Sequence, residues 1–252
     1  MKKLLLLSVM LSAAGLAQAA DRIMVFGDSN TFGWQWTPEM KATRLDPART
    51  WPEVMERALK DSGLDVRVIT EGLGGRTTDV DDAIDAGSGI IDGAGMNGLS
   101  YLPAALSSHM PLDLVIIMLG TNDFQARLHR TAPEIAVSLG RLAAVTREAQ
   151  WQSITDFRAP DVLIVTPPKM DTDGGPREAV FKGAKEKSAE LAKYAEPVVT
   201  AVGAWFMDAA DTVPYAGAAD KVHLTEAQHA ELGAAVACKV KEILEARKKS
   251  SE

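Results

Sequence analysis

Apolar runs of strand length alternate along the chain with longer helical patterns, and this alternation restricts the fold more than any other feature. The runs are almost unbroken in their apolar character, which is typical of parallel strands covered by helices on both faces. Repeated strand–helix units of this kind build α/β folds. The five expected strands are residues 22–26, 66–70, 112–119, 162–166 and 205–208. The expected helices are about residues 50–62, 102–109, 132–149, 176–194 and 225–247.

Two threonines mark the expected starts of helices. Thr50 is followed three residues later by Glu53, which is the pattern of a capping box, and Pro52 is tolerated in a first helical turn. Thr225 precedes Glu226 at the start of the last helical pattern. We expect both hydroxyls to cap free backbone N–H groups.

The N-terminal segment has the three parts of a secretory signal peptide. Lys2 and Lys3 are followed by an apolar stretch over residues 4–16, and Ala17-Gln18-Ala19 is a small-residue cleavage site. We expect residues 1–20 to be removed and the protein to be periplasmic or secreted, with an uncleaved anchor as the alternative. No other stretch is long and apolar enough to cross a bilayer, so no stable membrane insertion is expected. Without a repeat, a linker or a break in composition, residues 21–252 are expected to form a single domain.

Composition excludes several classes of partner. The chain has 252 residues, is 46% hydrophobic and carries a formal charge of −7, which removing Lys2 and Lys3 makes more negative. An acidic chain of this kind is a poor match for nucleic acid. Cys238 is the one cysteine, so it has no internal disulfide partner, and its apolar helical surroundings predict a buried thiol. With four histidines and one cysteine, a metal site has little support, and no cofactor is expected.

Residues 23–31 read Ile-Met-Val-Phe-Gly-Asp-Ser-Asn-Thr and connect the first expected strand to a turn. Open α/β sheets bind their ligands just beyond the carboxyl ends of the strands, which is where Ser29 falls. A helix N-terminus at this point would also stabilise a developing oxyanion. The alternative is that Asp28 or Ser29 only caps the segment that follows.

Four polar segments follow expected strands, at residues 27–30, 72–77, 120–123 and 220–223. Each segment alone is typical of a turn, a helix cap or an ordinary histidine. Together they supply a nucleophilic hydroxyl, a base, a carboxylate to orient the base and several oxyanion donors. This is the complete set of groups that acyl transfer needs.

The order and content of these segments resemble the SGNH hydrolases, also called the GDSL family. The four blocks of the family correspond here to Ser29, Gly75, Asn122 and His223. Residues 71–78, 100–106 and 111–123 are more similar still to its arylesterase/acyltransferase branch, the perhydrolases. The departures are Asn30, where the family has leucine, and an apparent extra loop at residues 150–158. The resemblance implies a flavodoxin-like, three-layer α/β/α fold with a central, mostly parallel five-stranded sheet.

The resemblance also implies roles for individual residues. Ser29 attacks the ester, His223 accepts its proton, and Asp220, three residues before His223, orients the ring; Asp208 is the alternative carboxylate. The expected oxyanion donors are the backbone N–H groups of Ser29 and Gly75 and the Asn122 side chain, with Gly74 as the alternative glycine.

Three long connections, residues 33–49, 87–99 and 167–175, are expected to border one pocket at the carboxyl ends of the strands. Phe32, Trp34 and Trp36 are expected to line this pocket with aromatic surface, and packing beneath a loop is the alternative role for these rings. The residues expected to line the pocket are Asn30, Phe32, Trp34, Gly74 and Val222.

These features predict a serine esterase that hydrolyses small aryl or short-chain acyl esters through an acyl-serine intermediate. The branch resemblance adds acyl transfer to alcohols or hydrogen peroxide, and it implies a homo-oligomer. A carbohydrate O-deacetylase or a thioesterase would use the same residues. An exported binding module that kept the fold is the alternative without catalysis.

Overall fold

Five parallel strands form the central sheet, in the order β4-β1-β5-β6-β7. The structure is a computed structural model that describes residues 20–83, 92–148 and 157–249. The predicted fold class is confirmed, and every strand pair in this sheet is parallel. In chain order the strands read 2-1-3-4-5, which is the flavodoxin-like arrangement. The strands are β1 (Asp21–Gly27), β4 (Val66–Gly72), β5 (Leu114–Met118), β6 (Asp161–Thr166) and β7 (Trp205–Asp208).

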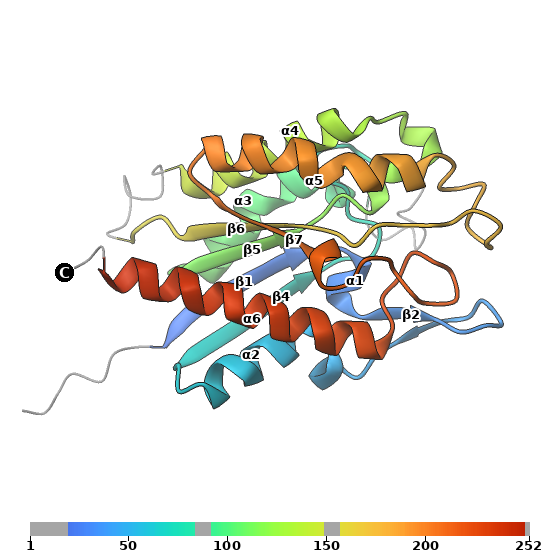
Figure 1. The fold of residues 1–252 in the computed structure, drawn as a ribbon. Helices are drawn as coiled ribbons and strands as arrows, with labels where there is room; N and C mark the ends of the chain where they lie inside the picture. The colour runs from blue at the N-terminus through green and yellow to red at the C-terminus, as the bar shows by residue number, and fades with distance from the viewer. Residues whose placement is uncertain (1–19, 84–91, 149–156, 250–252) are drawn as a thin grey trace, which may run out of the picture.

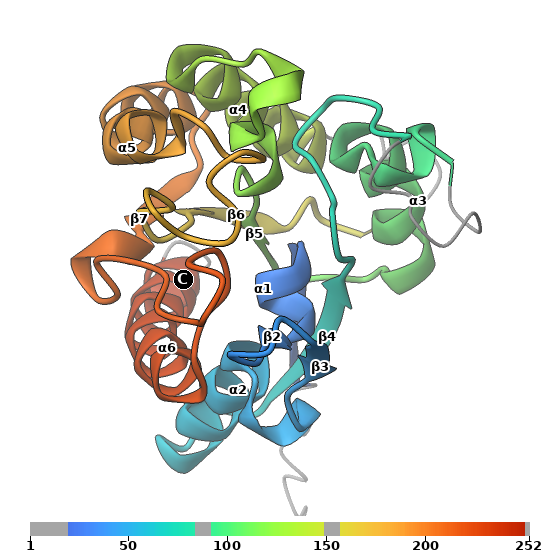
Figure 2. The same cartoon turned by 90° about the vertical axis from the view of Figure 1, so that its right-hand side faces the viewer.

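Helices cover both faces of the sheet (Figures 1 and 2). One face carries α3 (Gly98–His109), α4 (Ala132–Arg147) and α5 (Ala184–Ala201). The other face carries α2 (Trp51–Asp61) and α6 (Glu226–Lys249). The three-layer arrangement follows from strands that are apolar on both sides, since each side has to be removed from water.

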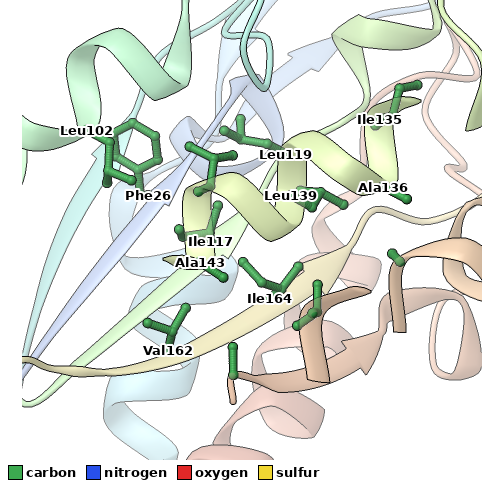
Figure 3. Close-up of a cluster of buried hydrophobic side chains, with 14 of the residues drawn as sticks. Phe26, Leu102, Ile117, Leu119, Ile135, Ala136, Leu139, Ala143, Val162 and Ile164 are labelled. Carbon is green, nitrogen blue, oxygen red and sulfur yellow. The ribbon is translucent and has the colours of Figure 1, made fainter. Parts of the chain in front are cut away.

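Successive residues of each strand pack into different layers. In β1, Met24 and Phe26 belong to the core beneath α3 and α4, whereas Ile23 and Val25 belong to the core beneath α2 and α6. Figure 3 shows the first of these cores, in which Phe26 of β1 lies beside Leu102 of α3 and Ile117 of β5 lies close to α4. The period of two along each strand therefore fixes which side chains stabilise which helix layer.

A small antiparallel pair of strands, β2 (Trp34–Trp36) and β3 (Ala42–Arg44), lies within residues 33–49, which we expected to be a loop. It follows α1 (Ser29–Phe32), a single helical turn directly after β1. The remaining short elements are 3-10 turns, named η1 (Pro47–Arg49), η2 (Ala94–Met96), η3 (Asn122–Phe124), η4 (Ala126–Leu128) and η6 (Ala209–Asp211).

Helix α5 differs most from its prediction, which placed it at residues 176–194. It begins only at Ala184, because Gly183 has a left-handed φ of 79° and residues 176–183 form turns. It then continues to Ala201 through Pro197, which lies on the exposed side. The buried residues Leu191, Ala195 and Val199 hold this part against the core, so packing outweighs the poor helical preference of proline.

The starts of α2 and α6 were predicted correctly, but not both of their caps. The Thr50 hydroxyl donates to the carbonyl of Pro47 at 2.8 Å instead of capping α2, so the capping box expected there was wrong. A complete capping box is present at the start of α4, between Thr131 and Glu134. At the start of α6, the Thr225 hydroxyl accepts the N–H of Gln228 at 3.3 Å, and the Thr225 N–H donates to the Gln228 side chain at 3.1 Å.

The buried residues of α6 include Leu232, Val236 and Val240, which repeat every four positions. Cys238 falls on the other side of this stripe and is exposed, so the expected burial of its thiol was wrong. Within the described residues, no helix combines the length and the apolar character needed to span a bilayer. The expected signal peptide, apart from residue 20, and most of the expected extra loop at 150–158 lie outside the described residues.

A buried histidine connects α2 and α6, the two helices that cover the same face of the sheet. His229 of α6 is fully buried, and its Nδ1 accepts the backbone N–H of Trp51, the first residue of α2, at 3.2 Å. Burial, followed by the charge on His223, lowers the pKa of His229 to about 4. The folded chain therefore holds this ring neutral in mild acid, where an unfolded chain would protonate it.

We expect the free energy of unfolding to fall as the pH falls from 6.5 towards 4, with a contribution of about 3 kcal/mol from His229. The contribution is fully present above the unfolded pKa and is lost as the unfolded chain takes up a proton. Urea unfolding of wild type and His229→Asn across this range would measure it, because groups common to both proteins cancel. The exposed His129 supplies the control His129→Asn, which should follow wild type. Parallel pH curves for wild type and His229→Asn would contradict the assignment.

Candidate active site

The candidate site lies at the carboxyl ends of β1, β4 and β5, the end of the sheet from which α1 projects in Figure 2. Ser29 follows β1, Gly75 follows β4 and Asn122 follows β5. In a sheet of this order, the connections from β1 and from its neighbour β5 depart towards opposite faces and leave a crevice. The topology thus brings together segments that are about 90 residues apart in the sequence.

The chain turns sharply between β1 and Ser29. Asp28 caps α1, its Oδ1 accepting the N–H of Asn30 at 2.9 Å. Gly27 is required at the end of β1, because a Cβ there would lie 2.0 Å from Oγ1 of Thr31. Ser29 is the first residue of α1, so its backbone N–H has no acceptor within the helix.

Asp28 is itself buried beneath this turn. Burial raises the pKa of Asp28 to about 6, against the lowering effect of its hydrogen bond with the Asn30 N–H. Its cap bond shows that Asp28 organises the turn that presents Ser29.

Ser29, His223 and Asp220 form one continuous series of hydrogen bonds. Nε2 of His223 lies 2.9 Å from Oγ of Ser29, and Nδ1 lies 2.6 Å from Oδ2 of Asp220. Burial raises the pKa of Asp220, but hydrogen bonds and charge from His223, together with the Val222 N–H, outweigh this effect and hold the pKa below its usual value. Asp220 is therefore ionised, as is needed to orient and stabilise a protonated imidazole.

Asp208, the alternative carboxylate, is engaged elsewhere. Its Oδ1 accepts the hydroxyl of Thr166 at 2.8 Å and the N–H of Ala210 at 3.1 Å. The structure thus brings Asp220, and not Asp208, to His223.

The His223 loop is held in place by the nucleophile turn. The Asn30 side chain donates to the carbonyl of Val222 at 3.3 Å and accepts the N–H of Leu224 at 3.0 Å. Asn30 is buried and lies outside the lining of the cavity described below, contrary to the expectation that it would border the pocket. Its amide is bonded to the residues on either side of His223, and so it fixes the backbone of His223 relative to Ser29.

Three N–H donors meet beside Ser29. Gly75 has a φ of 85° within a turn closed by the Arg76 N–H and the carbonyl of Leu73, a position that favours glycine. Among the described residues, the backbone N–H groups of Ser29 and Gly75 have no hydrogen-bond acceptor. The Asn122 amide donates one N–H to the Arg76 carbonyl at 3.0 Å, which leaves its second N–H available.

The loop that carries Asn122 is anchored by its neighbour Asp123, which is fully buried. The Asp123 carboxylate accepts the N–H of Thr78 at 2.9 Å and the Thr78 hydroxyl at 2.5 Å. Arg130 donates to the same carboxylate at 3.1 Å. These bonds tie the turn after β5 to the segment after β4, and so fix Asn122 relative to Gly75.

A cavity of about 580 Å³ opens over these groups. Of the residues predicted to line it, Trp34, Trp36, Gly74 and Val222 do so together with Ser29, Gly75, Asn122 and His223. Phe32 does not, because its ring packs between Trp34, at a centroid distance of 5.4 Å, and the guanidinium of Arg44. The other lining residues are Ala42, Gln125, Arg177, Val180 and Phe181.

The residues that the predicted lining omitted come mainly from the segment misread as helix. Arg177, Val180 and Phe181 all lie in the turns at residues 176–183. The carbonyl of Val180 accepts the N–H of Ala126 at 2.8 Å, which fixes this segment against η4. Gly174, Gly175 and Pro176 were the available sequence signal for a turn rather than a helix.

The other histidines lie outside the lining of this cavity. His109 pairs with Glu71 at 2.7 Å, and His229 holds α2 as described above. Within the described residues, no three His, Cys, Asp or Glu side chains gather in a way that could hold a metal ion.

Comparisons with known proteins agree with this architecture. Residues 25–231 match the model of the GDSL-like Lipase/Acylhydrolase family. An arylesterase of Vibrio mimicus is 33% identical over 123 residues, covering 49% of this chain and 48% of that protein. Esterase TesA of Pseudomonas aeruginosa is 33% identical over 121 residues, covering 47% of each chain. The matches thus span about half the length of these curated relatives.

Solved structures match over a larger share of the chain. An inhibitor-bound aryl esterase of M. smegmatis has a TM-score of 0.79 and 36% identity, covering 88% of this chain and 99% of that one. A carbohydrate acetylesterase from Sinorhizobium meliloti gives the same four values. The resemblance to SGNH hydrolases seen in the sequence is confirmed. Because the family model matches well over half of the residues, the chain belongs to the GDSL-like lipase/acylhydrolase family, on its arylesterase branch.

Proposed function

We propose that the protein is a serine esterase that hydrolyses small aryl or short-chain acyl esters through an acyl-Ser29 intermediate. The observation that carries this proposal is the hydrogen-bonded series from Ser29 through His223 to Asp220 at the wall of the cavity. Relatives described as arylesterase and esterase support the same class of reaction.

In the acylation step, Oγ of Ser29 attacks the ester carbonyl while Nε2 of His223 takes its proton. Asp220 holds the ring with its proton on Nδ1 and stabilises the imidazolium that forms. His223 then donates the proton to the departing alcohol or phenol. In the second step, water attacks the acyl-serine while His223 accepts its proton. His223 then returns the proton to Oγ of Ser29 as the bond from Oγ to the acyl carbon breaks, and the carboxylic acid leaves.

The negative oxygen of each tetrahedral intermediate is bound by the N–H groups of Ser29 and Gly75 and by the Asn122 amide. Neither backbone donor has an acceptor within the part of the chain that the structure describes, and Asn122 is held by Arg76 and by the anchored loop. Donors that are already oriented stabilise the transition state without reorganising, and one such donor contributes about 3 kcal/mol.

Carbohydrate O-deacetylation is the second candidate. A structural relative described as a carbohydrate acetylesterase matches this chain as well as the aryl esterase does. Trp34 and Trp36 in the cavity wall favour an aryl or compact acyl group, because their rings supply flat apolar surface. Acetyl esters of a phenol and of a sugar, compared at equal concentration, distinguish the two.

Replacing Ser29 by alanine removes the nucleophile, and we expect kcat/KM for p-nitrophenyl acetate to fall by about four orders of magnitude or more. Wild type should prefer acetyl or butyryl esters over long acyl chains. Ser107→Ala, at an exposed hydroxyl of α3, is the matched control and should keep full activity. Equal rates in wild type and in a folded Ser29→Ala protein would refute the mechanism and favour a binding module.

Replacing Asn122 by alanine removes one oxyanion donor. We expect kcat to fall by about 10²–10³-fold while KM changes little, since this donor acts on the transition state. Asn97→Ala removes the cap of α3, outside the cavity lining, and should lower stability without lowering kcat. A loss below about fivefold in Asn122→Ala would argue against the assigned role.

We also propose that the acyl-serine is transferred to alcohols. The apolar wall formed by Trp34, Trp36, Val180, Phe181 and Val222 supports this, because it accommodates an alkyl group next to the ester. With p-nitrophenyl acetate in water containing ethanol, we expect the fraction of acetyl groups recovered as ethyl acetate to exceed the mole fraction of ethanol in the solvent. Acetate alone as product would restrict the protein to hydrolysis, and Ser29→Ala measures the uncatalysed background.

A further inference from the structure

Arg177 lies in the cavity wall, and its guanidinium has no carboxylate within hydrogen-bond distance among the described residues. Its side chain is 28% exposed, and its guanidinium carbon lies 4.3 Å from the ring centroid of Trp36. The Nε atom is buried without a hydrogen-bond partner among the described residues. The nearest carboxylate oxygen is Oδ2 of Asp220 at 4.0 Å, beyond hydrogen-bond distance.

A guanidinium carries five N–H donors, and burying such donors without partners is costly. Arg130, which is more deeply buried, satisfies its donors with Asp79, Asp123, the Glu134 carbonyl and the Ser138 hydroxyl. Arg177 has only the face of Trp36 and a distant carboxylate. Its donors are therefore available to something that enters the cavity.

Asp220 does not account for Arg177. Its Oδ2 is bonded to the His223 ring, and its Oδ1 accepts the N–H groups of Val222 and His223 at 3.1 Å each. Burial apart, these same groups determine the lowered pKa of Asp220. The carboxylate is thus satisfied without the guanidinium.

The lining of the cavity contrasts with the rest of the protein. The whole chain carries a formal charge of −7. Among the described residues that line the cavity there is no aspartate or glutamate, and Arg177 is the one permanently charged side chain. A single cation in a partly dry, aromatic pocket attracts an anion more strongly than a cation in open water would.

We propose that Arg177 binds a carboxylate of the substrate, so that the preferred esters are anionic. This inference rests on the proposed esterase function. The ring of Trp36 lies 4.3 Å from the guanidinium carbon of Arg177 and 6.4 Å from the ring of His223, so one aromatic wall borders both groups. A substrate lying along Trp36 places its ester carbonyl at Ser29 and its carboxylate at Arg177, where planar paired hydrogen bonds form.

Two pairs of esters test the proposal and identify which end of the substrate carries the charge. On the alcohol side, 4-acetoxybenzoate is compared with its neutral methyl ester. On the acyl side, monophenyl adipate is compared with phenyl hexanoate. The quantity measured is the ratio of kcat/KM for the anionic ester to kcat/KM for its neutral partner. The intrinsic reactivities of the two esters are the same for every enzyme, so they cancel when the ratios of two enzymes are compared.

Three variants are compared with wild type. Arg177→Gln removes the charge, Arg177→Lys keeps it without the planar fork, and Arg44→Gln is the matched control. Arg44 also stacks on an aromatic ring, that of Phe32 at 3.7 Å, but lies outside the cavity lining. Thermal unfolding of each variant checks that it is folded before its activity is compared.

We expect the anionic-to-neutral ratio to fall about tenfold or more in Arg177→Gln for at least one pair, mainly through KM. Arg177→Lys should keep part of the preference, and Arg44→Gln should keep all of it. The pH profile for the neutral ester should be the same in wild type and Arg177→Gln. An unchanged ratio for both pairs, an equal loss for both members of a pair, or a shifted pH profile would overturn the proposal.

Failure of the underlying function would give a different result. In that case, wild type would not turn over the neutral esters, or folded Ser29→Ala would turn them over equally well. Turnover of neutral esters that requires Ser29, with no effect of Arg177 on the ratio, would leave the esterase intact and refute the role of Arg177.

Discussion

The hydrogen bonding of β1 along both of its edges is the constraint on which the site depends. β1 pairs with β4 and β5 up to its last residue, Gly27, which lies opposite Gly72 and Met118. Since the strand ends inside the sheet, the next residues emerge between two neighbouring strand ends and not at an edge. The absence of a side chain at Gly27 allows α1 to return closely over the strand. Ser29 is thereby presented directly after a strand that is held along both edges, and the segments after β4 and β5 reach it through short connections.

Buried polar groups then convert this position into fixed geometry. Arg76, almost fully buried, donates to the carbonyls of Gly27 at 2.9 Å and Glu71 at 2.5 Å, and stacks on Phe26. It thus fastens the segment after β4 to the end of β1. Asp123 does the same between the segments after β4 and β5, and Asn30 between the nucleophile turn and the His223 loop. Each of these groups would be costly to bury if one partner were lost, which makes the connections specific and rigid.

The strands and the polar segments could be predicted from the sequence because their signals are local. An unbroken apolar run reports burial on both faces, and the small polar residues at its end report a turn. The remaining features depend on distant partners. Residues 176–183 contain Arg177, Glu178 and Ala179, which favour a helix, but Phe181 is buried in the core and Gly183 adopts a left-handed conformation. The Thr50 hydroxyl can either accept a helix N–H as a cap or donate to a nearby carbonyl, and sequence alone does not show that it donates to Pro47.

Asn30 illustrates how chemistry and selectivity are separated in this fold. It departs from the leucine of the family at the position next to the nucleophile, yet its amide faces the His223 loop and not the cavity. The asparagine therefore acts on the backbone that positions His223, and its side chain is not part of the cavity lining. Apart from the His223 loop, the lining residues away from the strand ends come from two peripheral segments, the β2–β3 pair and the turns before α5. Neither belongs to the central sheet, so side chains such as Trp36 and Arg177 can differ without moving Ser29, His223 or Asp220. Such a division lets one constrained scaffold keep its chemistry while its peripheral segments set the shape and charge of the ester that fits.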